Sequence, residues 1–292
     1  MMSARFLTVV LERAFNMRDG FGREIDYMRI SVIDSCNLNC YYCNPCDNNE
    51  HCHALNILSV KEVLCIVRAA TRLGIKHFRL TGGEPLLHPQ LDEMVLQIKK
   101  IPGVSSVSLT TNAVLLAQHA KWLKEAGIDS INVSLDTIDA SEYERITKKP
   151  LLEEVKHGIN AAIECGIRVK INVVLTPQTD VVALTRYVAK KGTDIRFIEM
   201  MPVGEGHTNG VEPYKKVIGT LSKLYGEPCR INTEKTKEIN SGNNKRKIPD
   251  NGPAEYYIFP ELGIRVGLIQ AIHGKFCDTC NRIRVTADGR LM

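Results

Sequence analysis

One pattern recurs four times between residues 28 and 200: a helical stretch ends at a glycine, and a short apolar run follows it. The glycines are Gly74, Gly127, Gly166 and Gly192. Glycine directly after a helix adopts the left-handed conformation without a Cβ clash, and short β-branched runs are typical of buried parallel strands. The alternation therefore predicts an α/β fold built from repeated strand–helix units.

Two further apolar runs, 28–33 and 106–110, bring the number of expected strand–helix units to six. A closed barrel of this type needs eight, so we expect an open, partial (βα)6 TIM-like barrel. A doubly wound sheet is the alternative. Ser59 and Glu62 form a capping-box pattern that predicts a helix over 59–73.

The alternation stops after Pro202. Residues 203–252 are rich in Gly, Asn and Lys, and we expect a single helix there, at about 213–225. Three short strands follow, and they predict a small antiparallel β layer over the open side of the barrel: 256–259, 265–269 and 283–286. The expected organisation is an N-terminal extension (1–17), a partial barrel (18–202) and a C-terminal region (203–292).

The chain has ten cysteines, although 292 residues bury enough surface to fold without disulfides. In a large α/β chain such cysteines indicate metal binding, which requires a reducing compartment, so we expect an intracellular, cytoplasmic protein. No apolar run approaches the ~20 residues of a membrane span. The net charge of +5 permits an anionic substrate and does not demand nucleic acid.

Cys36, Cys40 and Cys43 follow the first expected strand with the spacing C-x3-C-x2-C. Three thiolates can hold three irons of a cubane cluster and leave the fourth iron open, as a catalytic zinc keeps one position free. The spacing predicts chemistry on a ligand that chelates iron. Cys46 is an alternative fourth ligand of the cluster. Cys46, Cys52, His51 and His53 together are either a zinc site or residues without a metal-binding role.

Small polar residues follow one expected strand after another, where parallel α/β folds gather their chemistry. Gly82-Gly83-Glu84 permits close backbone approach to a ligand, and Glu84 can accept from an ammonium group. Near the end of the chain, Cys277-x2-Cys280 is half of a zinc site, a redox pair or two surface thiols. Arg282 and Arg284 alternate on a strand and form a candidate phosphate clamp.

Together, the cysteine motif and Thr81–Pro85 resemble the radical S-adenosylmethionine (SAM) superfamily. From about residue 19 onward the chain is similar to the GTP 3′,8-cyclases, the molybdenum cofactor biosynthesis protein A family. The runs that carry this similarity include Asn132–Asp136, Val169–Asn172, Arg196–Glu199 and Phe276–Gly289. The resemblance implies a radical SAM fold and conversion of GTP to (8S)-3′,8-cyclo-7,8-dihydroguanosine 5′-triphosphate, the first step of molybdenum cofactor biosynthesis.

The resemblance also implies two 4Fe-4S clusters. The first would lie on Cys36, Cys40 and Cys43, and the second on Cys277, Cys280 and one further cysteine. The residues that would contact SAM are Tyr42, Gly83, Glu84, Ser134 and Met201. The positions that match GTP-binding residues are Arg29, Arg79, Thr110, Lys170, Arg196, Arg282 and Arg284, of which the last two are also expected to act in catalysis.

Two departures from the family pattern stand out. The third cysteine of the second cluster would fall at position 294, beyond Met292, so we expect the sequence to be a fragment of the active protein. Position 77, usually a lysine in the family, is His77, which weakens one phosphate contact at neutral pH. The roles of Cys46, Cys52 and Cys229 stay open.

By resemblance, the partners would be a second copy of the chain, a one-electron reductant and cyclic pyranopterin monophosphate synthase downstream, with no nucleic acid and no membrane. Two other functions remain alternatives. One is a different radical SAM enzyme with an auxiliary cluster, acting for instance on a peptide. The other is a non-catalytic iron–sulfur protein.

Overall fold

The computed structural model describes residues 17–43, 56–201, 213–231, 239–241, 244–246, 253–274, 278 and 280–292. Six strands of one sheet pair in parallel, each with the next along the chain. They are β1 (Tyr27–Ser31), β2 (His77–Thr81), β3 (Ser106–Thr111), β4 (Ser130–Ser134), β5 (Val169–Leu175) and β6 (Asp194–Glu199).

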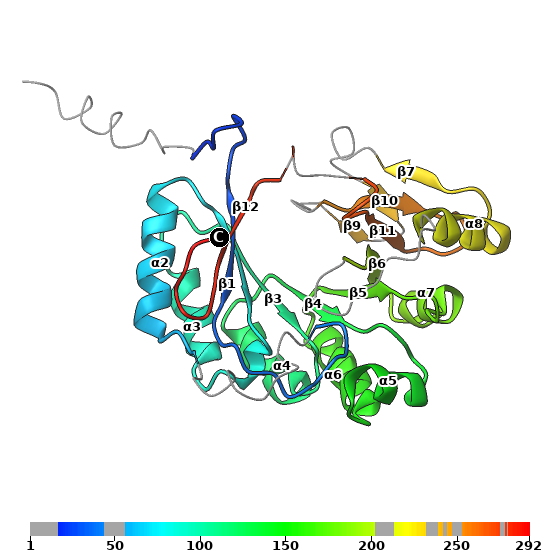
Figure 1. Cartoon of the computed structure of the whole chain (residues 1–292), viewed down its shortest axis with the longest axis horizontal. Coiled ribbons are helices and arrows are strands. Elements are labelled where there is room, and N and C mark those ends of the chain that lie inside the picture. Colours follow the sequence, from blue (N-terminus) through cyan, green and yellow to red (C-terminus); the bar gives the residue numbers. More distant parts are fainter. Residues whose placement is uncertain are drawn as a thin grey trace, which may run out of the picture.

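Helices cover the outer, convex face of this curved sheet (Figure 1). They are α2 (Val60–Arg72), α3 (Leu91–Lys99), α4 (Leu116–Glu125), α5 (Ala140–Thr147), α6 (Leu152–Glu164) and α7 (Val181–Lys190), with a short 3-10 helix, η1 (Pro85–Leu87), after β2. Helices on one face of six parallel strands make an open, partial barrel. The expected (βα)6 architecture is therefore confirmed, and the doubly wound alternative is wrong.

The glycines and the capping box that predicted the strand–helix units have the expected backbone geometry. Each of the glycines after α2, α4, α6 and α7 has a positive φ, between 63° and 90°. The capping box of α2 is complete: Glu62 N donates to Ser59 Oγ, and Ser59 N donates to the Glu62 carboxylate at 2.8 Å.

The C-terminal strands extend the same sheet at both edges. After α8 (Pro213–Tyr225) come β7 (Cys229–Ile231), β10 (Glu255–Ile258) and β11 (Arg265–Ile269), and β10 pairs antiparallel with both β7 and β11. Two further strands, β8 (Ile239–Ser241) and β9 (Asn244–Arg246), form a separate hairpin. β11 then joins β6 in parallel.

The last strand, β12 (Arg282–Val285), departs from expectation. It was predicted to belong to the antiparallel layer, and instead it pairs in parallel with β1 at the opposite edge of the sheet. Its register places Arg284 beside Arg29, which is itself beside Arg79 on β2. This pairing between the two ends of the chain is non-local, so no pattern within 283–286 could reveal it.

One hydrophobic core fills the space between the sheet and the helices, with Phe78, Leu109 and Phe197 among its fully buried side chains. No helix in the described part of the chain is long and apolar enough to cross a bilayer.

Helices α4 and α6 approach each other closely at Gly158. A Cβ at that position would lie 2.4 Å from the Ala113 carbonyl oxygen and 3.0 Å from the Leu116 Cβ. We predict that Gly158→Ala lowers the free energy of unfolding by about 1–3 kcal/mol, the usual cost of overpacking. Gly219→Ala in α8, where nothing lies within 4 Å of the added Cβ, should instead stabilise the chain by up to ~1 kcal/mol. Urea denaturation of both variants checks this, and equal effects would contradict it.

Candidate active site

The loop Cys36–Cys43 leaves the carboxyl end of β1 and rests on the last turn of α5. Asn39 N donates to the Thr147 carbonyl oxygen at 3.0 Å. Tyr41 N donates to the Ile146 carbonyl oxygen at 3.1 Å. These bonds fix the path of the loop while its three cysteines remain free thiols, two exposed and one half-buried.

The surroundings of the three thiols suit a cationic metal group. Desolvation raises the pKa of all three, and that of Cys40 reaches about 12, where Asp136 and the other two thiols add repulsion. Yet Cys36 Sγ has donors nearby: Leu38 N at 3.4 Å and Asn112 Nδ2 at 3.7 Å. Thiolates are costly here without a cation, and a bound metal group reverses that cost.

The arrangement of the metal-binding side chains favours an iron–sulfur cluster over a single metal ion. Within the described residues, no group of three or more His, Cys, Asp or Glu side chains is placed to hold one metal ion. In a cubane cluster each thiolate binds a different iron atom, so the sulfurs need not converge on one point. The three cysteines therefore fit an iron–sulfur cluster.

The glycines after β2 pack against the start of the cysteine loop. Gly83 N donates to the Ile33 carbonyl oxygen at 2.8 Å, and Glu84 N donates to the Ser35 carbonyl oxygen at 2.8 Å. A Cβ on Gly83 would lie 2.2 Å from that Ser35 oxygen. The close approach that the sequence assigned to a ligand is thus made, in the described structure, to the backbone that leads into Cys36.

Glu84 is 1% exposed and turns inward. Its carboxylate accepts from Leu86 N at 3.0 Å, Thr111 Oγ1 at 2.6 Å and Asn112 N at 2.7 Å. Burial raises its pKa to about 7 despite these donors. Glu84 therefore connects the end of β2 to the end of β3 and fixes Asn112, which contacts Cys36. Its expected contact with the amino group of SAM stays a prediction.

A second buried carboxylate, Asp136, joins the cysteine loop to the sheet. It accepts a short hydrogen bond from the Tyr42 hydroxyl. Its other oxygen accepts from Val174 N at 2.7 Å. Burial raises the pKa of Asp136 to about 6 and raises that of Tyr42 as well. In the sequence, Asp136 appeared only as the end of the family-like run Asn132–Asp136, and the structure makes it a positioning residue for the loop.

The other residues expected to contact SAM all lie at the carboxyl edge of the sheet. Tyr42 and Gly83 follow β1 and β2, Ser134 ends β4, and Met201 follows β6. Ser134 is exposed, and Met201 is 53% exposed. All four therefore lie at the edge of the sheet from which the cysteine loop leaves, and their roles remain predictions.

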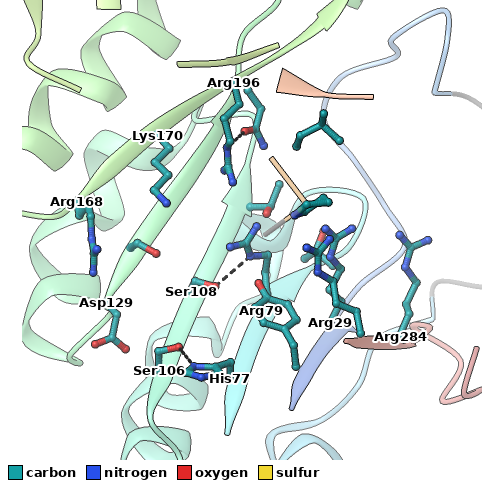
Figure 2. A pocket seen from close by; sticks show the side chains of 18 of the residues that line it. Arg29, His77, Arg79, Ser106, Ser108, Asp129, Arg168, Lys170, Arg196 and Arg284 are labelled. Carbon is teal, nitrogen blue, oxygen red and sulfur yellow. Dashed lines mark hydrogen bonds between the residues drawn. The ribbon is translucent and has the colours of Figure 1, made fainter. Parts of the chain in front are cut away.

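A cavity of about 550 Å³ occupies the inner side of the curved sheet (Figure 2). All seven residues expected to bind GTP line it: Arg29, Arg79, Thr110, Lys170, Arg196, Arg282 and Arg284. They come from β1, β2, β3, β5, β6 and β12. The structure thus brings together in one cavity side chains that lie up to 255 residues apart in the sequence, because their strands pair in parallel register.

The cavity is strongly cationic. Asp129 is the one acidic side chain among the described residues that line it. Burial, together with neighbouring guanidiniums, lowers the pKa of Arg79 to about 10 and lowers that of Arg29. In the described structure, Arg29 Nε and Arg196 Nη2 are buried donors with no hydrogen-bond acceptor. Buried, mutually repelling donors of this kind fit a polyanionic ligand.

Several of these cationic groups are held in place. Arg79 Nε donates to Ser108 Oγ at 3.1 Å, and Arg196 Nε donates to Asn172 Oδ1 at 2.9 Å. The Tyr27 ring lies between two guanidiniums, 5.5 Å from that of Arg79 and 5.6 Å from that of Arg282. Guanidiniums fixed before a ligand binds lose less entropy when it does.

Sequence reasoning missed several lining residues, among them Tyr27, Ser106, Ser108, Ser130 and Arg168. Apart from Ser130, each lies two or four positions from another lining residue on the same strand or just before it. Alternate residues of a strand share a face, so polar residues at every second position were the available signal. These polar residues could be recognised as lining residues only once the inner face of the sheet was known.

The second cysteine pair is only partly described. Cys277 lies outside the described residues, as do Cys46 and Cys52, and Cys280 is half-buried. Cys229 is exposed at the start of β7. Shortly before this pair, Ile272 N and His273 N donate to the Glu199 carboxylate at 2.8 and 3.1 Å, which ties the segment to the end of β6.

We predict that Asp136→Ala loosens the cysteine loop, because it leaves the Tyr42 hydroxyl and Val174 N without their acceptor. Each lost buried partner costs about 1–3 kcal/mol. The variant should unfold at lower urea concentration than the unaltered chain and lose iron faster under a chelator. Tyr42→Phe removes one of the two bonds and should show a smaller effect of the same kind. Unchanged iron retention in Asp136→Ala would contradict the positioning role.

Comparison with known proteins agrees with this geometry. Residues 30–184 match the radical SAM superfamily, and residues 193–292 match Molybdenum Cofactor Synthesis C. The chain is 37% identical over 276 residues to GTP 3′,8-cyclase from Clostridium perfringens (strain 13), covering 94% of this chain and 81% of the relative. It is 38% identical over 282 residues to the same enzyme from Pelotomaculum thermopropionicum, covering 94% and 82%.

Among solved structures, Streptococcus suis SuiB with its precursor peptide SuiA has a TM-score of 0.66 and 14% identity, and the match covers 99% of this chain and 62% of SuiB. Methylornithine synthase has a TM-score of 0.55 and 16% identity, over 78% of this chain and 71% of that one. At these identities the likeness shows the radical SAM fold alone. On the sequence matches over nearly its whole length, the chain belongs to the GTP 3′,8-cyclase family of radical SAM enzymes.

Proposed function

We propose that the cationic cavity of this member of the GTP 3′,8-cyclase family holds its substrate with the phosphate chain deep in the barrel and the ribose beneath the cysteine loop. The family reaction converts GTP to (8S)-3′,8-cyclo-7,8-dihydroguanosine 5′-triphosphate at the start of molybdenum cofactor biosynthesis. The observation that supports the binding site is that seven residues, expected on independent grounds to bind GTP, line a single cavity.

The proposed orientation of GTP in the cavity follows from the register of the strands. Arg29, Arg79 and Arg284 lie side by side on β1, β2 and β12, and Arg282 lies two residues nearer the amino end of β12. The cysteine loop lies beyond the carboxyl ends. Phosphate oxygens favour the guanidinium group, so the ribose, where the chemistry must occur, faces the cysteine loop.

Cys36, Cys40 and Cys43 would hold the first 4Fe-4S cluster, and Tyr42, Gly83, Ser134 and Met201 would contact SAM beside it. When bound, these cofactors supply the radical that removes hydrogen from the ribose C3′ of GTP. The chain itself neutralises and orients the substrate through its fixed guanidiniums. Glu84 and Asp136 hold the loop so that the distance between cluster and substrate is set by the sheet.

The remaining assignments extend the same proposal. A second cluster would bind Cys277, Cys280 and one further cysteine, and it would hold the guanine base. The enzyme would act as a homodimer, receive electrons from a one-electron reductant and pass its product to cyclic pyranopterin monophosphate synthase. The barrel would comprise residues 18–202 and the cluster and GTP region residues 203–292, with 1–17 as an extension.

Anaerobic turnover tests the function. We expect the reconstituted protein, continued past position 294, to form 5′-deoxyadenosine and a cyclised GTP product in equal amounts when given GTP, SAM and reductant. Cys43→Ala removes one cluster ligand and should abolish both products, as followed by chromatography and mass spectrometry. Formation of 5′-deoxyadenosine without a cyclised nucleotide would overturn the substrate assignment and favour another radical SAM reaction, such as one on a peptide.

His77 gives GTP binding a pH dependence. Burial lowers its pKa below the ordinary 6.5, and its Nδ1 lies 2.8 Å from Ser106 Oγ, so the ring is neutral at pH 7. A bound phosphate chain favours the protonated ring, so affinity should increase as the pH falls from about 7.5 to about 5.5.

We predict that the ratio of GTP affinities of the unaltered chain and His77→Asn grows at least threefold over that pH interval, a change of about 0.7 kcal/mol. The asparagine variant corrects for protonation of GTP itself. His77→Lys should bind GTP more tightly than the unaltered chain at pH 7.5. Titration calorimetry measures all three, and a ratio that does not change with pH would show that His77 does not face the phosphates.

A further inference from the structure

We propose that Arg168 is an additional phosphate-binding residue, which contacts the terminal phosphate and gives the cavity its preference for a nucleoside triphosphate over a diphosphate. The inference rests on the proposed function, because it takes GTP as the ligand. Arg168 immediately precedes β5 and lines the cavity, yet neither the sequence motifs nor the expected GTP-binding set included it.

Strand register places Arg168 at the far end of one row of inward-facing residues. Arg284, Arg29 and Arg79 begin the row on β12, β1 and β2. Ser108 and Ser130 continue it on β3 and β4. Ile131 pairs with Val169, so the next step from Ser130 is Arg168. Every member of this row lines the cavity.

The row has guanidiniums at both ends and hydroxyls in its middle. Figure 2 shows Arg168 on one side of the cavity, with Arg29, Arg79 and Arg284 on the other side. Cations on opposite walls repel one another until an anion lies between them. A phosphate group there would receive donors from both walls, and guanidinium forks match phosphate oxygens.

Asp129 is the competing partner for Arg168, since it lines the same end of the cavity. Its Oδ2 is already held by Lys99 Nζ at 2.9 Å and by Val107 N at 2.7 Å. No ion pair of 4 Å or less joins Asp129 to Arg168 in the described structure, and Arg168 is exposed to solvent. Arg168 is therefore available to a ligand that reaches this end.

The position also explains why the terminal phosphate is the group concerned. Arg168 precedes Lys170 by two residues on the same inward face, and Lys170 lies nearer the carboxyl end. A phosphate chain that starts at a ribose facing the cysteine loop meets Lys170 and Thr110 first and Arg168 last. A shorter phosphate chain would leave Arg168 without a contact.

Arg168→Gln tests the proposal by equilibrium binding of GTP and GDP to the reconstituted protein. We expect GTP affinity to fall about tenfold and GDP affinity to change less than twofold, so that the preference for GTP is largely lost. Arg168→Lys, which keeps the charge but not the fork, should fall between. Arg68→Gln on the outer helix α2 makes the same charge change away from the cavity and should alter neither affinity. SAM affinity should be unchanged in all variants.

Two results would overturn the inference: GTP affinity of Arg168→Gln within twofold of the unaltered chain, or equal losses for GTP and GDP, which would assign Arg168 to general charge attraction. The proposed function has a different point of failure. If the unaltered chain binds neither guanine nucleotide, the substrate assignment is wrong and the inference falls with it. If the unaltered chain binds and cyclises GTP, and Arg168→Gln has the same nucleotide affinities as the unaltered chain, only the inference fails.

Discussion

Parallel pairing of β1 with strands on both of its sides is the constraint on which the site depends. Because parallel partners present their side chains to the same face, the pairs Arg29–Arg79 and Arg29–Arg284 bring three guanidiniums together. Their mutual repulsion and desolvation oppose folding, as the lowered pKa of Arg29 and Arg79 shows. The sheet hydrogen bonds and the apolar core on the other face outweigh that cost, so the protein keeps a preformed site for a polyanion.

A different kind of interaction organises the carboxyl edge. There the charged groups are carboxylates, and each is surrounded by donors: Glu84 takes three hydrogen bonds and Asp136 takes two. Both connect neighbouring strands to the cysteine loop or to the residue that contacts it. The cationic and carboxylate regions are thus separated along the strand direction. One end of the barrel attracts the substrate, and the other end holds the loop that would carry the reactive cofactor.

Local sequence patterns were enough to predict the strand–helix units. Gly74 and the three equivalent glycines have the positive φ expected of them, and helix α8 has the predicted bounds. The motifs also identified the residues that line the cavity at Arg29, Lys170 and Arg196, through family resemblance. These features succeed because each depends on residues close together in the chain or on positions that a motif labels.

Pairings between distant segments could not be predicted in the same way. The parallel contact of β12 with β1 joins residues 29 and 284, and nothing within 283–286 distinguishes it from an antiparallel hairpin. The inward turn of Glu84 depends on donors from η1 and β3, which the motif around it does not specify. Arg168 carries no motif, and its place in the cavity emerges only from the register of β4 and β5.

The position of β12 has a consequence for the order in which the enzyme becomes competent. Residues 282–285 leave the ribosome well after β1 to β6, yet they supply two guanidiniums of the cavity and form one edge of the sheet. A nascent chain can assemble β1 to β6 beforehand, but it cannot complete the nucleotide site. Substrate capture is thereby delayed until β12 has been made, and a chain cut before residue 282 would retain most of the barrel without two of its phosphate-binding guanidiniums.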